Sequence, residues 1–316
     1  MKILITGGAG FQGSHLVESL VNKGHEVTVL NTFTPQSSQN KKYVEGKAEV
    51  VWGSITDAEI TEKAVRGKDV VFHLGARVNV DESILHPWET IETNVRGTYN
   101  VLEAVRRNGA RMIHTSTCEV YGTPEKIPIS ENAELRPMSP YAASKAAADR
   151  LCFAYAQTYK TPVIIARFFN IFGERQKETK FGAVIPIFVS KALNGETIKV
   201  FGDGAQTRDY VHVSDVIRAY ERLLEHPELA GEVINFGTGR GTAIKEIAEH
   251  IAKSLGGQVE YTEGRPGEAS DMIAGIDKAG RLLGWEPLVS FSEGLDRYIA
   301  WRKSEITSPD LNLIRV

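Results

Sequence analysis

The sequence has few of the features that would place it outside an ordinary reducing, aqueous compartment. It contains two cysteines in 316 residues, too few for a disulfide framework. No apolar run is long enough to cross a membrane. The opening segment is a strand-like run and a glycine loop, unlike a signal or transit peptide. We therefore expect a cytoplasmic protein with no membrane partner.

The chain also lacks an excess of charge of either sign. It has 37 Lys and Arg against 40 Asp and Glu, a formal net charge of −3, and the basic residues are spread throughout. Binding to nucleic acid would require a basic stripe or patch, so no nucleic-acid partner is expected. The hydrophobic fraction of 42% is typical of a globular protein with a substantial core.

Short apolar runs alternate regularly with helical patterns. Strands are expected at residues 2–6, 26–30, 48–52, 69–74, 111–116 and 162–167, and helices at 14–23, 57–65, 90–108 and 141–159. This alternation predicts an α/β fold with a Rossmann-type, doubly wound parallel sheet. Segments become shorter near residue 170. We expect one domain over 1–170 and a smaller, irregular region over 171–316, with some chain crossing back.

A glycine loop follows the first expected strand. Gly7, Gly10 and Gly13 have G-x-x-G-x-x-G spacing, with Phe11 and Gln12 between the last two. Such glycines allow a tight turn, close approach of the backbone to a pyrophosphate, and close packing of helix on strand. The anion then meets the N–H groups at the helix start. Because the loop lies between a strand and a helix, the pattern predicts dinucleotide binding rather than a flexible turn.

The second expected strand ends at Asn31, where a dinucleotide-binding fold commonly has an acidic residue for the adenosine ribose. An amide can hydrogen-bond a ribose hydroxyl but cannot repel a 2′-phosphate. The nearest cations are Lys41 and Lys42, and no arginine is close in sequence. The pattern favours NAD over NADP, and the first domain is then the NAD-binding domain.

Tyr141 and Lys145 form a second constellation. Their spacing of four puts them on one face of a helix, one turn apart. An ammonium beside a phenol lowers the phenol's pKa, so that the tyrosine can exchange a proton near neutral pH. The alternative is an exposed helix start in which the tyrosine stacks on the lysine stem.

Together these motifs resemble the extended short-chain dehydrogenase/reductase superfamily, in its NAD-dependent nucleotide-sugar epimerase/dehydratase branch. The resemblance covers nearly the whole chain. It implies that Tyr141 and Lys145 also contact the cofactor, together with Ser54, Ile55, Leu74 and Ala76. It further implies a nucleotide-sugar substrate, with UDP as the expected carrier. The substrate-binding residues that it implies are Asn94, Asn170, Val184, Arg208, Arg265 and Glu268. No metal is implied.

The resemblance also implies a reaction that begins with oxidation of C4 of the sugar by NAD, with Tyr141 removing the O4 proton. Thr117, Cys118 and Glu119 follow the fifth expected strand. Related 4,6-dehydratases carry Thr-Asp-Glu there, in which Thr polarises O4, Asp protonates the leaving hydroxyl and Glu takes the C5 proton. Thr-Cys-Glu is similar to the UDP-N-acetylglucosamine 5,6-dehydratase of tunicamycin-type pathways. A protonated thiol could replace the Asp; alternatively, Cys118 is a small hydrophobic filler.

The leading hypothesis is therefore a dehydratase of a nucleotide-linked hexose or hexosamine, with either a 4,6 or a 5,6 outcome. A UDP-hexose 4-epimerase is the first alternative, although epimerisation needs no C5 base such as Glu119. A UDP-glucuronate decarboxylase is the second, with Arg77 and Arg175 as candidate partners of the sugar carboxylate. A redox-sensing protein that binds NAD without turnover would not need the full catalytic set.

A homodimer is also expected from the resemblance, because family members pair their long helices into a four-helix bundle. The corresponding segments here are residues 90–108 and 141–159, and Phe153 and Tyr155 are compatible outer positions.

Overall fold

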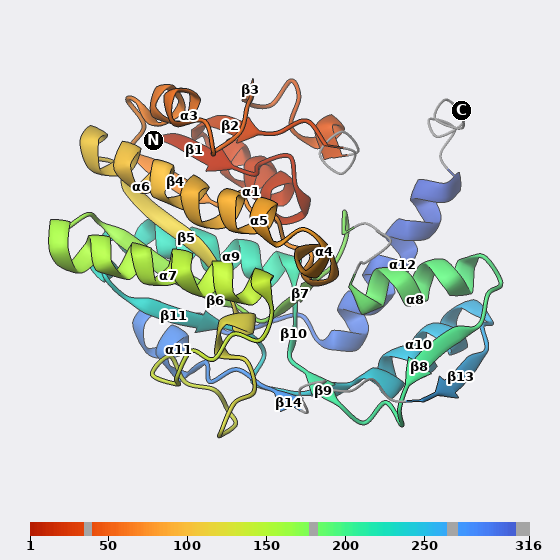
Figure 1. Cartoon of the computed structure of the whole chain (residues 1–316). Helices are drawn as coiled ribbons and strands as arrows, with labels where there is room; N and C mark the ends of the chain where they lie inside the picture. The colour runs from red at the N-terminus through yellow and green to blue at the C-terminus, as the bar shows by residue number, and fades with distance from the viewer. Residues whose placement is uncertain (35–39, 177–182, 264–270, 308–316) are drawn as a thin grey trace.

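The computed structural model describes residues 1–34, 40–176, 183–263 and 271–307. Its centre is a seven-stranded sheet in the order β11-β6-β5-β4-β1-β2-β3 (Figure 1). All six strand pairs are parallel. The predicted α/β, Rossmann-type fold is therefore confirmed. The strands are β1 (Lys2–Thr6), β2 (Glu26–Asn31), β3 (Glu49–Trp52), β4 (Val70–His73), β5 (Arg111–Thr117), β6 (Val163–Phe168) and β11 (Val233–Phe236).

Helices cover both faces of this sheet, and two hydrophobic clusters fill the layers between them. One face carries α1 (Phe11–Asn22), α9 (Val213–Glu225) and α11 (Asp277–Leu283). The other carries α3 (Ala58–Val65), α6 (Gly97–Asn108) and α7 (Pro140–Tyr159). Near-continuous apolar strands are what a sheet buried on both faces requires. No helix within the described ranges is long and apolar enough to cross a bilayer.

The expected elements are present, with bounds that differ by a few residues. The predicted helix at 14–23 begins earlier because the glycine loop leads directly into Phe11. The predicted helix at 90–108 is a continuous helical stretch with a π turn in its middle. Its parts are α5 (Pro87–Ile91), η2 (Glu92–Arg96) and α6, and the short α4 (Val80–Leu85) precedes them.

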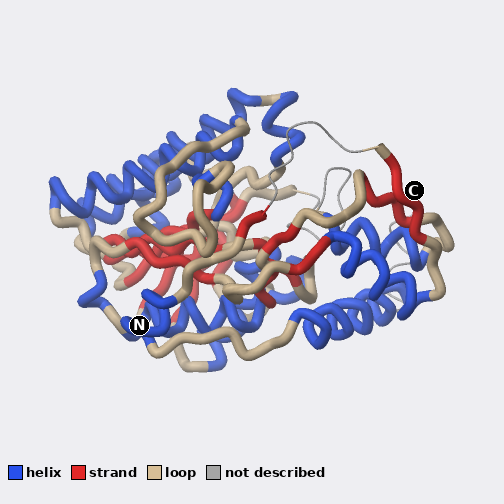
Figure 2. The backbone as a smooth tube through the Cα atoms, turned by 90° about the horizontal axis from the view of Figure 1, so that it is seen from below, coloured by secondary structure: helices blue, strands red, loops and turns tan. Residues whose placement is uncertain are grey.

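The C-terminal part builds a small lobe at one end of the sheet, with its own hydrophobic cluster (Figure 2). Its helices are α8 (Val184–Leu193), α10 (Ile244–Leu255) and α12 (Phe291–Thr307). Its short strands pair as β8 (Ile198–Phe201) with β13 (Val259–Thr262), β7 (Asn170–Phe172) with β10 (Tyr210–His212), and β9 (Thr207–Arg208) with β12 (Thr242–Ala243) and β14 (Asp271–Met272). Two single turns, η1 (Lys41–Tyr43) and η4 (Pro227–Leu229), lie in connections.

The chain crosses between the two parts more than once. After β10 it returns as α9, which packs on α1, and as β11, which pairs with β6 at the edge of the main sheet. The strand order reverses between β1 and β4, where β1 has β2 on its other side. Ligands of open parallel sheets bind at the carboxyl ends of the strands beside such a reversal. The fold thus points to the loops after β1, β4 and β5.

Candidate active site

The glycine loop after β1 has the shape that a dinucleotide pyrophosphate requires. Gly7 has a φ of 74°, and a Cβ there would lie 2.9 Å from the backbone nitrogen of Gly75. A Cβ on Gly13 would lie 2.3 Å from the carbonyl oxygen of Gly7. Glycine is therefore required at both positions by close backbone approach. α1 begins at Phe11, and the first N–H groups of a helix have no partner within it, so the loop and helix start together suit an anion.

Asn31 supports this loop from the end of β2. Its Oδ1 accepts from the backbone N–H of Ala9 at 3.2 Å, and its Nδ2 donates to the Thr32 carbonyl at 2.7 Å. Its side chain thus holds the glycine loop in addition to lying where the ribose is expected. Lys41 and Lys42 form ion pairs with Glu45 and Glu305, so both nearby cations already have carboxylate partners.

The predicted residues after β3 and β4 lie beside this loop. The Ser54 hydroxyl bonds to Thr56 at 2.7 Å, and Ile55 packs so closely on α6 that a Cβ on Gly97 would lie 2.6 Å from its side chain. The backbone N–H of Leu74 donates to the Thr6 carbonyl at 3.1 Å, and Ala76 lies in the half-buried loop that follows. Gln12 accepts from the Tyr220 hydroxyl at 3.0 Å.

Two supports of these loops were missed from the sequence. Asn100 donates to the carbonyls of Ile55 and Thr56 at 2.9 and 3.1 Å. His73 lies between the hydroxyls of Thr6 and Thr98, at 2.7 and 2.9 Å. Asn100 and His73 both lie in elements that the sequence predicts. Their hydrogen bonds to segments distant in the sequence, however, leave no trace in the hydrophobic periodicity from which those elements are predicted.

Tyr141 and Lys145 are both buried at the start of α7, with 8% and 6% of their surfaces exposed. Ser139 caps this helix by accepting from the Ala142 N–H at 3.1 Å. Lys145 Nζ donates to the Thr115 carbonyl at 2.6 Å, and burial lowers its pKa to about 8. These positions exclude the exposed helix start that was the alternative.

The lowering of the Tyr141 pKa that the spacing predicted is not observed in the protein alone. Burial raises the pKa of Tyr141, the charge of Glu119 raises it further, and a hydrogen bond with Thr117 opposes the change. Spacing indicates that two side chains share a helix face, but the desolvation of a phenol depends on the tertiary structure around it.

The Thr117–Glu119 run begins the turn η3 (Cys118–Tyr121), directly after β5. Thr117 Oγ1 accepts from the Glu119 N–H at 3.3 Å and so caps the turn. Gly122 ends it with a φ of 62°, and a Cβ there would lie 1.8 Å from the Arg136 carbonyl oxygen. Glycine is thus required at position 122 by a close crossing of two backbone segments.

Cys118 and Glu119 lie near Tyr141 and Arg208. The charges of Glu119 and Cys118 raise the pKa of Tyr141, and the charge of Arg208 acts to lower the pKa values of Cys118 and Glu119. Burial is the main reason that the pKa of Glu119 is raised, and the positive charge of Arg208 opposes the change. Cys118 is 2% exposed and packs in an apolar cluster with Phe169. Burial, followed by the charge of Glu119, raises the pKa of its thiol well above the usual value, so the thiol is protonated at neutral pH.

The predicted substrate residues occupy different environments. The side chain of Asn94 is 1% exposed and bonds to the backbone of Arg77 and to the Ser144 hydroxyl. Asn170 donates from Nδ2 to the Asp209 carbonyl at 3.2 Å. Val184 is the first residue of α8, and Arg208 ends β9. Arg265 and Glu268 lie outside the described residues.

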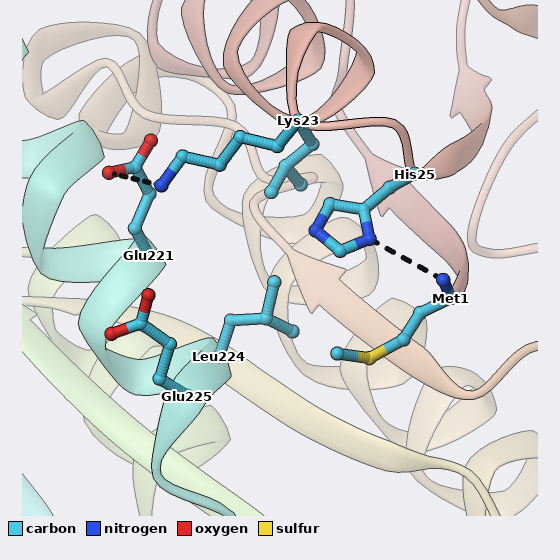
Figure 3. A pocket seen from close by; sticks show the side chains of 7 residues that line it. Met1, Lys23, His25, Glu221, Leu224 and Glu225 are labelled. Carbon is cyan, nitrogen blue, oxygen red and sulfur yellow. Dashed lines mark hydrogen bonds and ion pairs between the residues drawn. The ribbon is translucent and has the colours of Figure 1, made fainter.

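A pocket at the opposite edge of the sheet takes no part in this arrangement (Figure 3). It is lined by residues at the starts of β1 and β2 and on α9, among them Met1, His25 and Leu224. The carboxyl-edge residues above do not line it. Across the part of the chain that the structure describes, no group of three or more His, Cys, Asp or Glu side chains is placed to hold a metal ion.

Comparison with known proteins agrees with this arrangement. The sequence profile of the NAD dependent epimerase/dehydratase family matches residues 3–237. The chain belongs to this family. It is therefore an enzyme of an NAD-dependent family, and the predicted cofactor is confirmed as NAD.

Relatives of similar closeness carry out different reactions. The chain is 36% identical to a putative UDP-glucose 4-epimerase of Methanocaldococcus jannaschii, over 96% of this chain and 98% of the relative. It is also 36% identical to a UDP-N-acetyl-alpha-D-glucosaminuronate decarboxylase of Bacillus cytotoxicus, over 95% and 97%. A dTDP-glucose 4,6-dehydratase of Streptomyces venezuelae, solved with NAD bound, superposes with a TM-score of 0.88 at 35% identity, over 96% and 97%. Family membership thus leaves the final chemical step open.

Proposed function

We propose that the protein is an NAD-dependent dehydratase of a nucleotide-linked hexose or hexosamine, with UDP as the carrier, and so a lyase rather than an isomerase. The observation that supports this most is the Glu119 carboxyl group, whose pKa is raised by burial beside Thr117 and Tyr141. A carboxylate with a raised pKa is a stronger base. Abstraction of a C5 proton needs such a base, whereas C4 epimerisation does not.

The first half of the reaction is oxidation at C4. NAD, when bound, would supply the acceptor for the C4 hydride and the donor that gives this hydride back. Tyr141 takes the O4 proton, and Thr117 donates a hydrogen bond to O4. Lys145, whose ammonium donates to the Thr115 carbonyl at 2.6 Å, would hold the nicotinamide ribose.

The second half is loss of water from the 4-keto sugar. Glu119 removes the C5 proton, which the adjacent ketone makes acidic, and the C6–O bond breaks. The departing hydroxide takes the proton of the Cys118 thiol and leaves as water. Although burial raises the pKa of this thiol, hydroxide is a far stronger base than a thiolate, so the transfer is downhill. Glu119 then returns a proton to Cys118.

The fate of the hydride divides the two dehydratase outcomes. Its delivery to C6, with a proton from solvent at C5, would give a 4-keto-6-deoxy sugar, whereas its return to C4, with the proton from Tyr141 at O4, would give a 5,6-ene. The Thr-Cys-Glu run, which resembles the tunicamycin-type UDP-N-acetylglucosamine enzyme, favours the 5,6-ene. Asn170, Val184 and Arg208 are proposed to contact the nucleotide diphosphate, for which the planar fork of an arginine is well suited.

Exposed aromatic side chains on α6 and α7 support a homodimer formed through these two helices. Tyr99, Phe153 and Tyr159 are exposed by 46%, 37% and 55% on these two helices, whereas Tyr155 is buried and bonds to Glu103 at 2.8 Å. A second copy of the chain would cover the exposed rings.

Two other reactions have less support from the site. A 4-epimerase, the activity ascribed to the Methanocaldococcus relative, leaves Glu119 without a role. A decarboxylase needs cations at the sugar carboxylate, but Arg77 pairs with Glu82. Arg175 pairs with Glu18 and lies 3.9 Å from the centre of the Tyr43 ring.

Mass spectrometry of the products in heavy water tests the proposal. The purified protein is incubated with UDP-N-acetylglucosamine, UDP-glucose and UDP-glucuronate. Loss of one water supports a dehydratase, deuterium at C5 then identifies a 4-keto-6-deoxy product, and vinylic protons in the NMR spectrum identify the 5,6-ene. An unchanged mass with an inverted C4, or loss of carbon dioxide from UDP-glucuronate, would refute the dehydratase assignment.

A further inference from the structure

An ion pair between two buried side chains lies beneath the catalytic turn η3, and the exposed Arg150 also pairs with its carboxylate. Arg167 on β6 is 2% exposed and Asp149 on α7 is 0% exposed. The guanidinium donates from Nε to Oδ2 at 2.8 Å and from Nη2 to Oδ1 at 2.9 Å. This is the two-pronged geometry that makes arginine–carboxylate pairs directional. Ser116, at the end of β5, donates a further hydrogen bond to Asp149 Oδ2 at 2.8 Å.

The third arm of the same guanidinium reaches η3. Arg167 Nη1 donates to the Tyr121 hydroxyl at 2.9 Å, and the guanidinium carbon lies 4.9 Å from the centre of the Tyr121 ring. Nη1 also approaches the Glu131 carbonyl at 3.2 Å. The Tyr121 hydroxyl donates to Asn235 Oδ1 on β11 at 2.7 Å. All three nitrogens of Arg167 thus have partners.

Two of the three partners of Arg167, Asp149 and Tyr121, belong to the elements that carry the two halves of the catalytic set. Asp149 lies one helical turn after Lys145 on α7, the helix that also carries Tyr141. Tyr121 is the last residue of η3, the turn that starts after Thr117 and carries Glu119. One buried guanidinium therefore bonds at once to the element that holds the C4 acid–base group and to the element that holds the carboxylate proposed for C5.

Stability alone is a poor explanation for this arrangement. Removing two charges from water costs several kcal/mol per ion, and replacement of a buried ion pair by well-packed apolar side chains is often neutral or stabilising. What an apolar replacement does not supply is direction. A bidentate pair with a further hydrogen bond from the same guanidinium specifies the relative position of three elements, whereas apolar packing is less directional.

We infer that Arg167 is a positioning residue that fixes η3 against α7, and thereby sets where the Glu119 carboxylate lies relative to Tyr141. This inference rests on the proposed dehydratase function, because it concerns how the elimination step follows oxidation at one bound sugar. A displacement of about 1 Å at such a pair slows the step about 100-fold. A displacement of η3 should therefore slow the elimination step, in which Glu119 acts, more than the oxidation at C4.

Two conservative variants test this inference, with a matched control elsewhere in the fold. Arg167→Lys keeps the charge but loses the fork, and Tyr121→Phe removes only the hydroxyl that joins η3 to the guanidinium. Arg218→Met is the control, because Arg218 pairs with the buried Asp215 on α9, outside the site. For each variant we measure thermal stability, kcat and KM for loss of water, and the near-ultraviolet absorbance of reduced nicotinamide during turnover.

The inference predicts that Arg167→Lys and Tyr121→Phe lower kcat for water loss about 10- to 100-fold, with KM within about threefold of wild type. Reduced nicotinamide should accumulate, because oxidation at C4 then outruns elimination. Arg218→Met should lose stability with little change in kcat. If all three variants lose activity only in proportion to stability, and none accumulates reduced nicotinamide, Arg167 has only a structural role and the inference is wrong.

Failure of the proposed function would be distinguishable. If the wild-type product is a C4 epimer, the dehydratase assignment fails. The positioning role of Arg167 would then still predict a lower kcat at unchanged KM for Arg167→Lys and Tyr121→Phe, because Thr117 directly precedes η3 and acts at O4. An unchanged kcat in these variants would refute the positioning role.

Discussion

Burial of Lys145 should make the stability of the apoprotein depend on pH in a direction opposite to that of most proteins at alkaline pH. Burial lowers the pKa of this ammonium from 10.5 to about 8. At about 1.4 kcal/mol per pKa unit, the gap of 10.5 − 8 corresponds to about 3 kcal/mol of unfolding free energy. At pH values below the folded-state pKa, Lys145 is charged in both the folded and the unfolded protein, and the full free-energy cost of burying its charge lowers the stability. As pH rises from about 8 to 10.5, the folded protein has released a proton that the unfolded chain still binds, so stability increases.

Urea unfolding of wild type and Lys145→Met across this range measures the effect, at one fixed concentration of protein because a dimer would make stability concentration-dependent. The comparison with Lys145→Met is essential. The buried thiols of Cys118 and Cys152 have raised pKa values, and their ionisation in the unfolded chain destabilises both proteins as pH rises. We expect the wild-type free energy of unfolding to gain about 3 kcal/mol relative to Lys145→Met. A difference that stays constant with pH would show that Lys145 is not desolvated as the structure indicates.

Four further substitutions test other parts of the site. Glu119→Gln should slow water loss at least about 100-fold while C4 oxidation persists, and retained elimination would contradict the role of Glu119 as the base. In the wild type, kcat/KM should fall on the acid side at a pH above 4.5, because the pKa of Glu119 is raised. Cys118→Ala should slow water loss about 100-fold, and a variant that loses stability but keeps its turnover would make Cys118 a packing residue. Gly13→Ala places a Cβ 2.3 Å from the Gly7 carbonyl oxygen and should weaken NAD binding at least about 10-fold by calorimetry, whereas unchanged affinity would show that the loop adapts. Asn31→Asp should weaken NADP binding much more than NAD binding, because a carboxylate repels the 2′-phosphate; equal effects on both would place this residue away from the ribose.

The parts that could be predicted from sequence are those whose cause is local. The order of strands and helices follows from apolar periodicity, and the glycine loop follows from spacing between a strand and a helix. β11 was not predicted, because its four residues, Val233–Phe236, carry no pattern that distinguishes an edge strand of a distant sheet.

The remaining features depend on contacts between distant segments. Asn94 has the residue type of a ligand contact, yet its side chain bonds to a loop and a helix of the protein itself. The pairing of Arg167 with Asp149 is visible only once β6 and α7 are packed together. The raised pKa of Tyr141 likewise depends on burial, which spacing along one helix cannot report.

The return of β11 to the main sheet has a consequence for how the enzyme is made. During synthesis, β6 is an open edge until residues 233–236 emerge and pair with it, and an open strand edge is prone to pair with other chains. Asn235 on β11 also receives the Tyr121 hydroxyl, so the network beneath η3 is incomplete until then. A nascent chain that stops after the first 170 residues therefore contains every proposed proton-transfer group, but not the strand that closes the sheet and completes the support of the site.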